Sequence, residues 1–277
     1  VALEVKNRLK LELLEEKEFN LDQLIEREVT QTGTFHCKGG SEKCDRNCEI
    51  KILSLEGEKV PFGGACNKYY NVLSGKEVDV TKYDYVAMRE EIIFNRYISP
   101  IEDNTSATTV GICKSFLVNT LYPLYHNFFT KLGFKVVLSD EISEEGLKMK
   151  SSSFCFPAEI AHGEFDNLIS KNPDYIFLPQ VTEYHVKNSY SYKKEHQCTC
   201  LLLQSEPYYI KSAFKEKLSE HNIKLLSPVI DFSGGFDTQL AEFIKIAGWL
   251  GIGEKKAKEA YDFAVNSQAQ AFHDLKI

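Results

Sequence analysis

Hydrophobic and polar positions in the second part of the chain alternate between short apolar runs and longer segments with helical spacing. The strand-like runs are TTVGIC, FKVVLS, DYIFLP and CLLLQ, and the helix-like segments between them are LVNTLYPLYHNFFTKLG, PAEIAHGEFDNLISK and PYYIKSAFKEKLSEH. This alternation is typical of βαβ units. We therefore predict that residues 106–277 form a Rossmann-like α/β domain, with a mostly parallel sheet and flanking helices.

Helix ends and closing helices can also be predicted in this domain. Gly133 follows an apolar helical segment, and glycine adopts the left-handed conformation of a helix C-terminus at little cost. Two further helices are expected over residues 237–251 and 253–275. The segment 180–197 is polar and rich in tyrosine, and we expect a long surface loop there.

The first part of the chain has a different pattern. Residues 3–28 carry apolar positions at helical spacing, as one long helix or as two helices broken near Asn20, and residues 81–97 show the same spacing. EIKILSLEGEKVPFGG instead alternates as two short strands joined by a hairpin at Glu56 and Gly57. The polar segment ISPIEDNTSAT then resembles a linker. We predict that residues 1–105 comprise an N-terminal helix, a small cysteine-rich β unit and a second helix.

Composition narrows the class of protein. Of the 277 residues, 43 % are hydrophobic and 26 % are charged, which is typical of a globular chain. The net charge is −7 and no segment clusters Lys and Arg, so we expect no nucleic-acid partner. No run of about 18 apolar residues and no signal-peptide pattern is present, so we expect a cytoplasmic protein without a membrane partner. The chain begins at Val1 within a charged helical pattern, which predicts a piece of a longer polypeptide.

Eight cysteines are the most informative residues. Without an export signal they are expected to stay reduced, which favours metal binding or redox chemistry over disulfides. Cys37, Cys44, Cys48 and Cys66 have six, three and seventeen residues between successive members. Four thiolates can hold zinc or an iron-sulfur cluster, and His36 can replace one of them. The alternative is a set of unrelated free thiols.

A second set of cysteines lies in the predicted α/β domain. Cys113 ends a predicted strand, Cys155 precedes a helix begun at Pro157, and Cys198 and Cys200 form a close pair. Strand ends and helix N-termini are where open α/β sheets bind ligands. We therefore consider these cysteines cofactor-binding candidates. The alternative is that Cys113 is a core thiol and Cys200 a buried strand residue.

The segments NFFTKLGFKVVLSDEIS, KSSSFCFPAEIAHGEFDNLI, DYIFLPQV and CTCLLLQSEPYYI resemble a domain of large CoA-substrate-specific activase proteins. These are relatives of 2-hydroxyacyl-CoA dehydratase subunits and double-cubane cluster proteins. The preceding CDRNCEIKILSLEGEKVPFGGACNKY is similar to the cysteine-containing segment before that domain, so the resemblance covers about residues 37–275. The chain has Cys113 and Lys114 where the family usually has Pro-Arg, and Glu164 where it usually has His.

The resemblance implies an anaerobic system in which an ATP-driven reduction delivers an electron to an iron-sulfur protein. By resemblance, Cys155 is the first candidate ligand of a cluster, followed by Cys198 or Cys200, with Cys113 as an added candidate. Other domains of a larger activase-type protein, including an ATPase domain, are the implied partners, and an acyl-CoA is left open. No P-loop or G-x-G-x-x-G motif occurs in a suitable context, so the sequence does not support nucleotide binding by this chain.

Two functional hypotheses follow. In the first, the chain is the cluster-carrying or electron-accepting domain of an activase-related, iron-sulfur-dependent redox system acting on 2-hydroxyacyl-CoA compounds. In the second, the first four cysteines hold structural zinc and the chain is a non-catalytic module that docks other domains. No catalytic acid, base or nucleophile is predicted.

Overall fold

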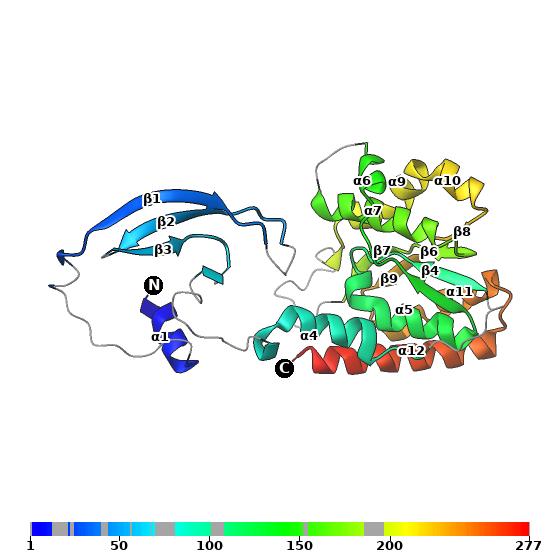
Figure 1. The fold of residues 1–277 in the computed structure, drawn as a ribbon. Helices are drawn as coiled ribbons and strands as arrows, with labels where there is room; N and C mark the ends of the chain where they lie inside the picture. Colours follow the sequence, from blue (N-terminus) through cyan, green and yellow to red (C-terminus); the bar gives the residue numbers. More distant parts are fainter. Residues whose placement is uncertain are drawn as a thin grey trace. The chain divides into compact units, whose positions relative to one another are not determined.

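The computed structural model describes residues 2–12, 22, 25–39, 44–55, 57–66, 68–69, 81–100, 108–151, 155–185 and 197–276. The chain forms two compact units, residues 1–84 and 85–277 (Figure 1). This division falls between Asp84 and Tyr85, earlier than the boundary predicted near residue 105. Ile92 and Ile93 explain the difference, because they are buried in the core of the second unit.

The first unit contains a helix and an antiparallel sheet. Helix α1 (Ala2–Lys10) occupies the start of the segment 3–28 that was predicted to be helical, and the described residues 26–28 at its end are not helical. Residues 13–21, 23 and 24 lie outside the described part. Strands β1 (Val29–His36), β2 (Glu49–Leu55) and β3 (Glu58–Phe62) pair in that order. The β2–β3 pairing confirms the predicted hairpin. Strand β1 was not predicted, because its polar side chains are mostly exposed and show no apolar alternation.

The second unit begins with helical turns and a parallel sheet. Helix α4 (Tyr85–Glu91) and the π-helical turn η3 (Ile92–Arg96) follow a short 3₁₀ helix, η2 (Thr81–Tyr83), which belongs to the end of the first unit. The predicted helix over 81–97 is confirmed as helical structure. Strands β4 (Thr109–Ile112), β5 (Lys135–Leu138), β6 (Tyr175–Phe177) and β8 (Lys224–Leu226) follow. They are parallel in the order β5-β4-β6-β8, which confirms the predicted α/β class.

Two prolines interrupt this sheet. Beyond Pro179 and Pro228, strands β7 (Gln180–Tyr184) and β9 (Val229–Phe232) form a separate parallel pair. Proline has no backbone N–H to donate to a ladder, so the hydrogen-bonded sheet divides at these positions. Strand β7 occupies the first residues of the predicted 180–197 loop, and residues 186–196 lie outside the described part.

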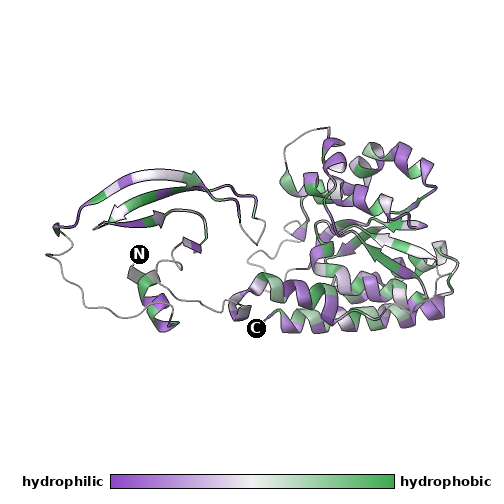
Figure 2. Ribbon diagram, viewed as in Figure 1, coloured by the Kyte–Doolittle hydropathy of each residue, from purple (hydrophilic) through white to green (hydrophobic). Residues whose placement is uncertain are grey.

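Helices cover both faces of the sheet (Figure 1). One face carries α5 (Val118–Leu132), α11 (Leu240–Trp249) and α12 (Glu254–Asp274). The 3₁₀ turn η5 (Phe236–Gln239) directly precedes α11. The other face carries α7 (Phe156–Ser170), α9 (Glu206–Ala213) and α10 (Lys215–Glu220). Hydrophobic and hydrophilic residues alternate along α12 (Figure 2), as expected for a helix with one buried face, whereas residues 121–129 of α5 are all buried. Gly133 ends α5 with φ 93°, as predicted.

Each face of the sheet has its own apolar core. Phe128 on α5 is fully buried and makes edge contacts with Phe129, Phe243 and Tyr261. The opposite core contains Phe165 on α7 and Phe214, which follows α9, packed at 5.2 Å between ring centroids. The sheet is therefore buried on both faces, which is characteristic of parallel sheets.

Glycines hold α6 (Glu144–Lys148) against α7. A Cβ on Gly146 would lie 2.5 Å from the carbonyl oxygen of His162, and one on Gly163 would lie 2.5 Å from the Ile142 side chain. Ser143 caps α6 and also donates to Asp166, which accepts a second bond from Lys217 at 2.5 Å. These contacts fix the chain that continues from α6 to Met149, Lys150 and Ser151.

One predicted element is wrong. CLLLQ, expected as a strand, contains helix α8 (Leu201–Gln204), which follows Cys200. A short apolar run does not distinguish a strand from a buried helix. Here the backbone N–H of Gln204 bonds Cys200, and its side-chain amide bonds Thr199, so local hydrogen bonds select the helix. Among the described residues, no helix is long and apolar enough to cross a membrane.

Candidate functional site

The site lies at the carboxyl end of the central strands. Strand β4 has β5 on one side and β6 on the other, so the chain order reverses next to β4. Ligands of open α/β sheets bind at such a reversal, outside the carboxyl ends of the strands. Cys113 directly follows β4 and lies at this position, where the sequence predicted a candidate residue.

Cys113 itself is part of the apolar core. Its side chain is 1 % exposed, and its Sγ lies 3.9 Å from the carbonyl oxygen of Ala161. Burial raises the pKa of the Cys113 thiol well above its usual value, and the nearby Glu206 carboxyl raises it further. The thiolate form that metals and clusters require is therefore disfavoured. This environment favours the core-thiol interpretation of Cys113.

Glu206 is a buried acid that the sequence analysis did not single out. It lies at the start of α9 with 5 % exposure, and the Ser115 hydroxyl donates to its Oε1 over 2.5 Å. Burial raises the pKa of Glu206 to about 7. Glu164 on α7 is 7 % exposed, and burial raises the pKa of its carboxyl as well. Two buried acids therefore lie near Cys113. Their positions in the sequence do not predict this, because the packing of distant segments brings them together.

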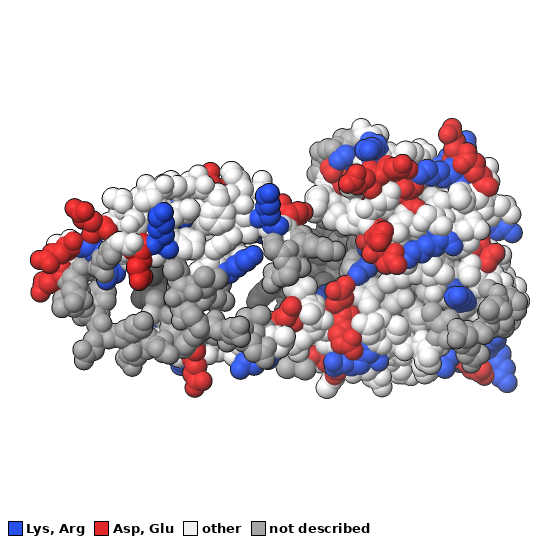
Figure 3. Space-filling model, viewed as in Figure 1, with Lys and Arg blue, Asp and Glu red and all other residues white. Residues whose placement is uncertain are grey.

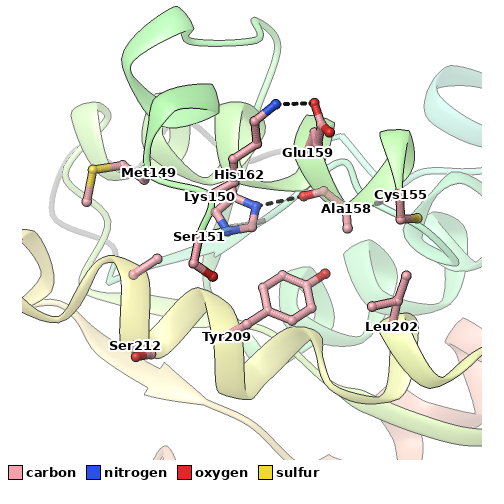
Figure 4. Close-up of a pocket in the computed structure, with 11 residues that line it drawn as sticks. Met149, Lys150, Ser151, Cys155, Ala158, Glu159, His162, Leu202, Tyr209 and Ser212 are labelled. Carbon is pink, nitrogen blue, oxygen red and sulfur yellow. Dashed lines mark hydrogen bonds and ion pairs between the residues drawn. The ribbon is translucent and has the colours of Figure 1, made fainter. Parts of the chain in front are cut away.

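Cys155 lines a pocket of about 240 Å³ between α7 and α9 (Figure 4). It is half-buried and is the N-cap residue of α7, in agreement with the prediction that it precedes this helix. Lys150 and Glu159 also line the pocket and form an ion pair.

Tyr209 forms one wall of this pocket. Its ring stacks on His162 at 5.3 Å with 14° between the planes, while His162 Nδ1 bonds the carbonyl of Ala158 at 2.7 Å. The Tyr209 hydroxyl is buried and has no hydrogen-bond partner among the described residues. An unpartnered buried hydroxyl is costly unless a bound group satisfies it.

Three cysteines from distant parts of the sequence surround Tyr209. Burial raises the pKa of the Tyr209 hydroxyl, and the nearby Glu206, Cys113, Cys155 and Cys200 raise it further. Cys200 is exposed at the start of α8, not buried in a strand. Cys198 is also exposed and forms an isolated β-bridge with Glu183. Cys155 therefore lines the same pocket as Tyr209, and Cys200 lies near enough to Tyr209 to affect its hydroxyl. Cys198 lies two residues before Cys200 in the chain.

The other four cysteines also meet. Cys37 follows the last residue of β1, Cys48 precedes the first residue of β2, and Cys66 follows β3, so antiparallel pairing brings all three to one end of the sheet. They line a pocket of about 260 Å³ together with Cys44. The backbone N–H of Cys37 bonds the carbonyl of Cys48 at 2.9 Å.

The environment of Cys37 favours its thiolate. Hydrogen bonds from the Tyr69 hydroxyl and the Gly39 backbone, together with the charge of Lys68, lower the pKa of the Cys37 thiol. The same hydrogen bond raises the pKa of Tyr69 to about 12. A thiolate is the form that binds zinc, so the donor set fits a metal. In the described part of the chain, however, no group of three or more Cys, His, Asp or Glu already has metal-binding geometry.

The fold and these sites define an α/β domain that carries cysteines at the ligand-binding edge of its sheet, with a separate cysteine-rich β unit before it. Residues 109–277 match the model of the family described as CoA enzyme activase uncharacterised domain (DUF2229). The match covers more than half of the chain, so the chain belongs to this family, as the resemblance in its sequence predicted. No curated protein and no solved structure matches the chain.

Proposed function

We propose that the α/β unit is the electron-accepting domain of an activase-type redox system, and that Cys155, Cys198 and Cys200 hold its iron-sulfur cluster. The observation that supports this proposal is that Cys155 and Cys200, from separate segments of the chain, both lie beside Tyr209. Membership of the activase family gives the reaction context. The ATPase and the enzyme that receives the electron would belong to partner domains.

The side chains around Tyr209 suit this role. Cys155 is half-buried and Cys198 and Cys200 are exposed, so their sulfurs are available to ligate a group at the surface. Cys155 lies at the N-terminus of α7, and the Tyr209 hydroxyl, which has no partner within the described part of the chain, can donate a hydrogen bond to a sulfur. A bound cluster would supply one-electron transfer. Cys113 is left out of the ligand set because it is buried between two acids.

Anaerobic purification followed by iron and acid-labile sulfide analysis tests this proposal. Cys155→Ser and Cys200→Ser are each expected to lose most of the iron and sulfide, because each removes a thiolate ligand. Cys113→Ala is the matched control and is expected to retain both. Equal metal content in Cys155→Ser, Cys200→Ser and the parent chain, with folding verified by circular dichroism, would contradict the proposed ligands.

We also propose a second role, a zinc-stabilised interaction module, for the N-terminal unit. Strand pairing brings Cys37, Cys44, Cys48 and Cys66 around one pocket, and four thiolates are a common structural zinc set. The antiparallel sheet has few buried side chains of its own, so a metal would add much of its stability. Such a unit would present its outer surface to partner domains.

Zinc analysis of the full chain tests this second role. The parent is expected to hold about one zinc per chain, and Cys48→Ser is expected to lose it. Cys200→Ser serves as the control, since Cys200 lies in the other unit. Chelation is expected to raise amide hydrogen exchange in β1–β3 and leave β4–β6 protected. Zinc that remains in Cys48→Ser, or is absent from the parent, would rule out this site.

A further inference from the structure

A second large cavity in the α/β unit has no cysteine in its lining. It is a groove of about 580 Å³ along β8, the outer strand of the four-stranded sheet, between α9 and the last residue of α11. Three aromatic side chains, Tyr175, Tyr208 and Trp249, and two lysines, Lys211 and Lys224, line it.

The aromatic side chains of the groove are unusually accessible. Trp249 is 52 % exposed and Tyr208 is 64 % exposed, although both belong to helices that pack on the sheet. The Tyr208 hydroxyl donates to Gln180 Oε1 at 3.0 Å, which fixes the tyrosine over the groove. Exposed aromatic faces around a cavity are suited to stacking on a planar ring.

The charge of the groove is positive. Lys224 lies over the Tyr175 ring, with its Nζ 5.7 Å from the centroid, and Lys211 lies on α9. The lining includes no Asp or Glu, and among the described residues neither lysine forms an ion pair with a carboxylate. Elsewhere acidic and basic side chains are interspersed, as on the face shown in Figure 3, and the chain carries a net charge of −7. The positive charge of the groove is therefore a local property, since the chain as a whole is acidic.

We propose that this groove binds a nucleotide, with its base stacked on Trp249 or Tyr208 and its phosphates held by Lys211 and Lys224. The shared ligand chemistry is an aromatic base that carries phosphate, as in free adenine nucleotides and in the adenosine end of coenzyme A. Lysine side chains bind phosphate as point charges, so this mode needs no glycine-rich loop. The outer side of β8 adds backbone N–H and C=O groups that no described strand pairs.

This site is separate from the cysteine site in its residues but close to it in the fold. Tyr208 faces the groove and Tyr209, the next residue of α9, faces the Cys155 pocket. Helix α9 therefore lies between the two cavities. The inference does not depend on the proposed cluster, since none of the groove residues is a candidate ligand.

The single tryptophan of the chain provides a direct test. Titration of the full chain with ADP and with coenzyme A is expected to change the emission of Trp249, and equilibrium dialysis is expected to give the same Kd. Adenosine has the base but no phosphate, and inorganic phosphate has no base, so each is expected to bind at least about tenfold more weakly than ADP. The relative affinity of ADP and coenzyme A identifies the source of the ligand.

Variants locate the binding. Lys211→Gln and Lys224→Gln are each expected to weaken binding by about tenfold, because each removes one charged contact to phosphate. Lys215→Gln, one turn further along the chain and outside the groove lining, makes the same change of charge and is expected to bind like the parent. Absence of binding in both assays would overturn the proposal. So would equal binding by all three variants, or phosphate binding as tight as that of the nucleotides.

Discussion

Replacement of Phe128 by alanine is expected to lower the free energy of unfolding of the α/β unit by about 3–5 kcal/mol. Phe128 is fully buried, and its ring meets Phe129, Phe243 and Tyr261 with centroid distances of 5.3, 4.9 and 6.3 Å. These contacts join α5 to α11 and α12. A cavity there would lose apolar burial, ring contacts and the packing of three helices.

Chemical denaturation followed by far-ultraviolet circular dichroism measures this loss. Phe263→Ala is the matched control, because Phe263 lies on α12 but is 41 % exposed and contacts the Lys131 ammonium at 4.2 Å from its ring centroid. Its replacement is expected to cost about 1 kcal/mol or less. Comparable losses in the two variants would show that the three helices are not joined through Phe128.

Glu206→Gln is expected to make the protein more stable than the parent above pH 7, by up to about 3 kcal/mol. Burial raises the pKa of Glu206 from 4.5 to about 7, so the native state binds more protons than the unfolded state between these values. The stability of the parent therefore falls as pH rises through this range. Above it, the full free-energy cost of burying the ionised carboxylate is present. Glutamine carries no charge and still offers an oxygen to the Ser115 hydroxyl.

Urea unfolding of parent and variant at a series of pH values tests this expectation. The two curves should converge below about pH 4.5, where the carboxyl is protonated in both states, and separate as pH rises. Glu216→Gln, an exposed substitution on α10, should follow the parent at every pH. The same pH dependence in Glu206→Gln and the parent would show that another group controls the transition.

Predictions from local pattern succeeded where one residue or one short segment decides the structure. Helical spacing located α5, α7 and α12, and Gly133 ended α5 because glycine accepts its φ of 93°. Predictions from local pattern failed where a strand or helix depends on its hydrogen-bond partners. Strand β1 is stabilised by pairing with β2 despite its polar side chains, and α8 is set by hydrogen bonds to Cys200 and Thr199.

The candidate cysteines show the same contrast. Residue type and spacing identified Cys155, Cys198, Cys200 and the four N-terminal cysteines as candidates, but not which of them meet. Antiparallel pairing brings Cys37, Cys48 and Cys66 to one end of a sheet. Cys155 at the start of α7 and Cys200 at the start of α8 both lie near Tyr209 on α9, because these three helices pack together. The metal and cluster assignments remain predictions that the purified protein can test.

The sequence by itself determined the α/β class, the family and the long helices α5, α7 and α12, because periodicity and glycine positions act within a few residues. Only the tertiary structure decided the environments of the functional groups. Cys113 is a protonated core thiol and Glu206 a buried acid because segments distant in sequence exclude water from both. Burial and neighbouring charge control ionisation, and both arise from contacts that no local pattern encodes.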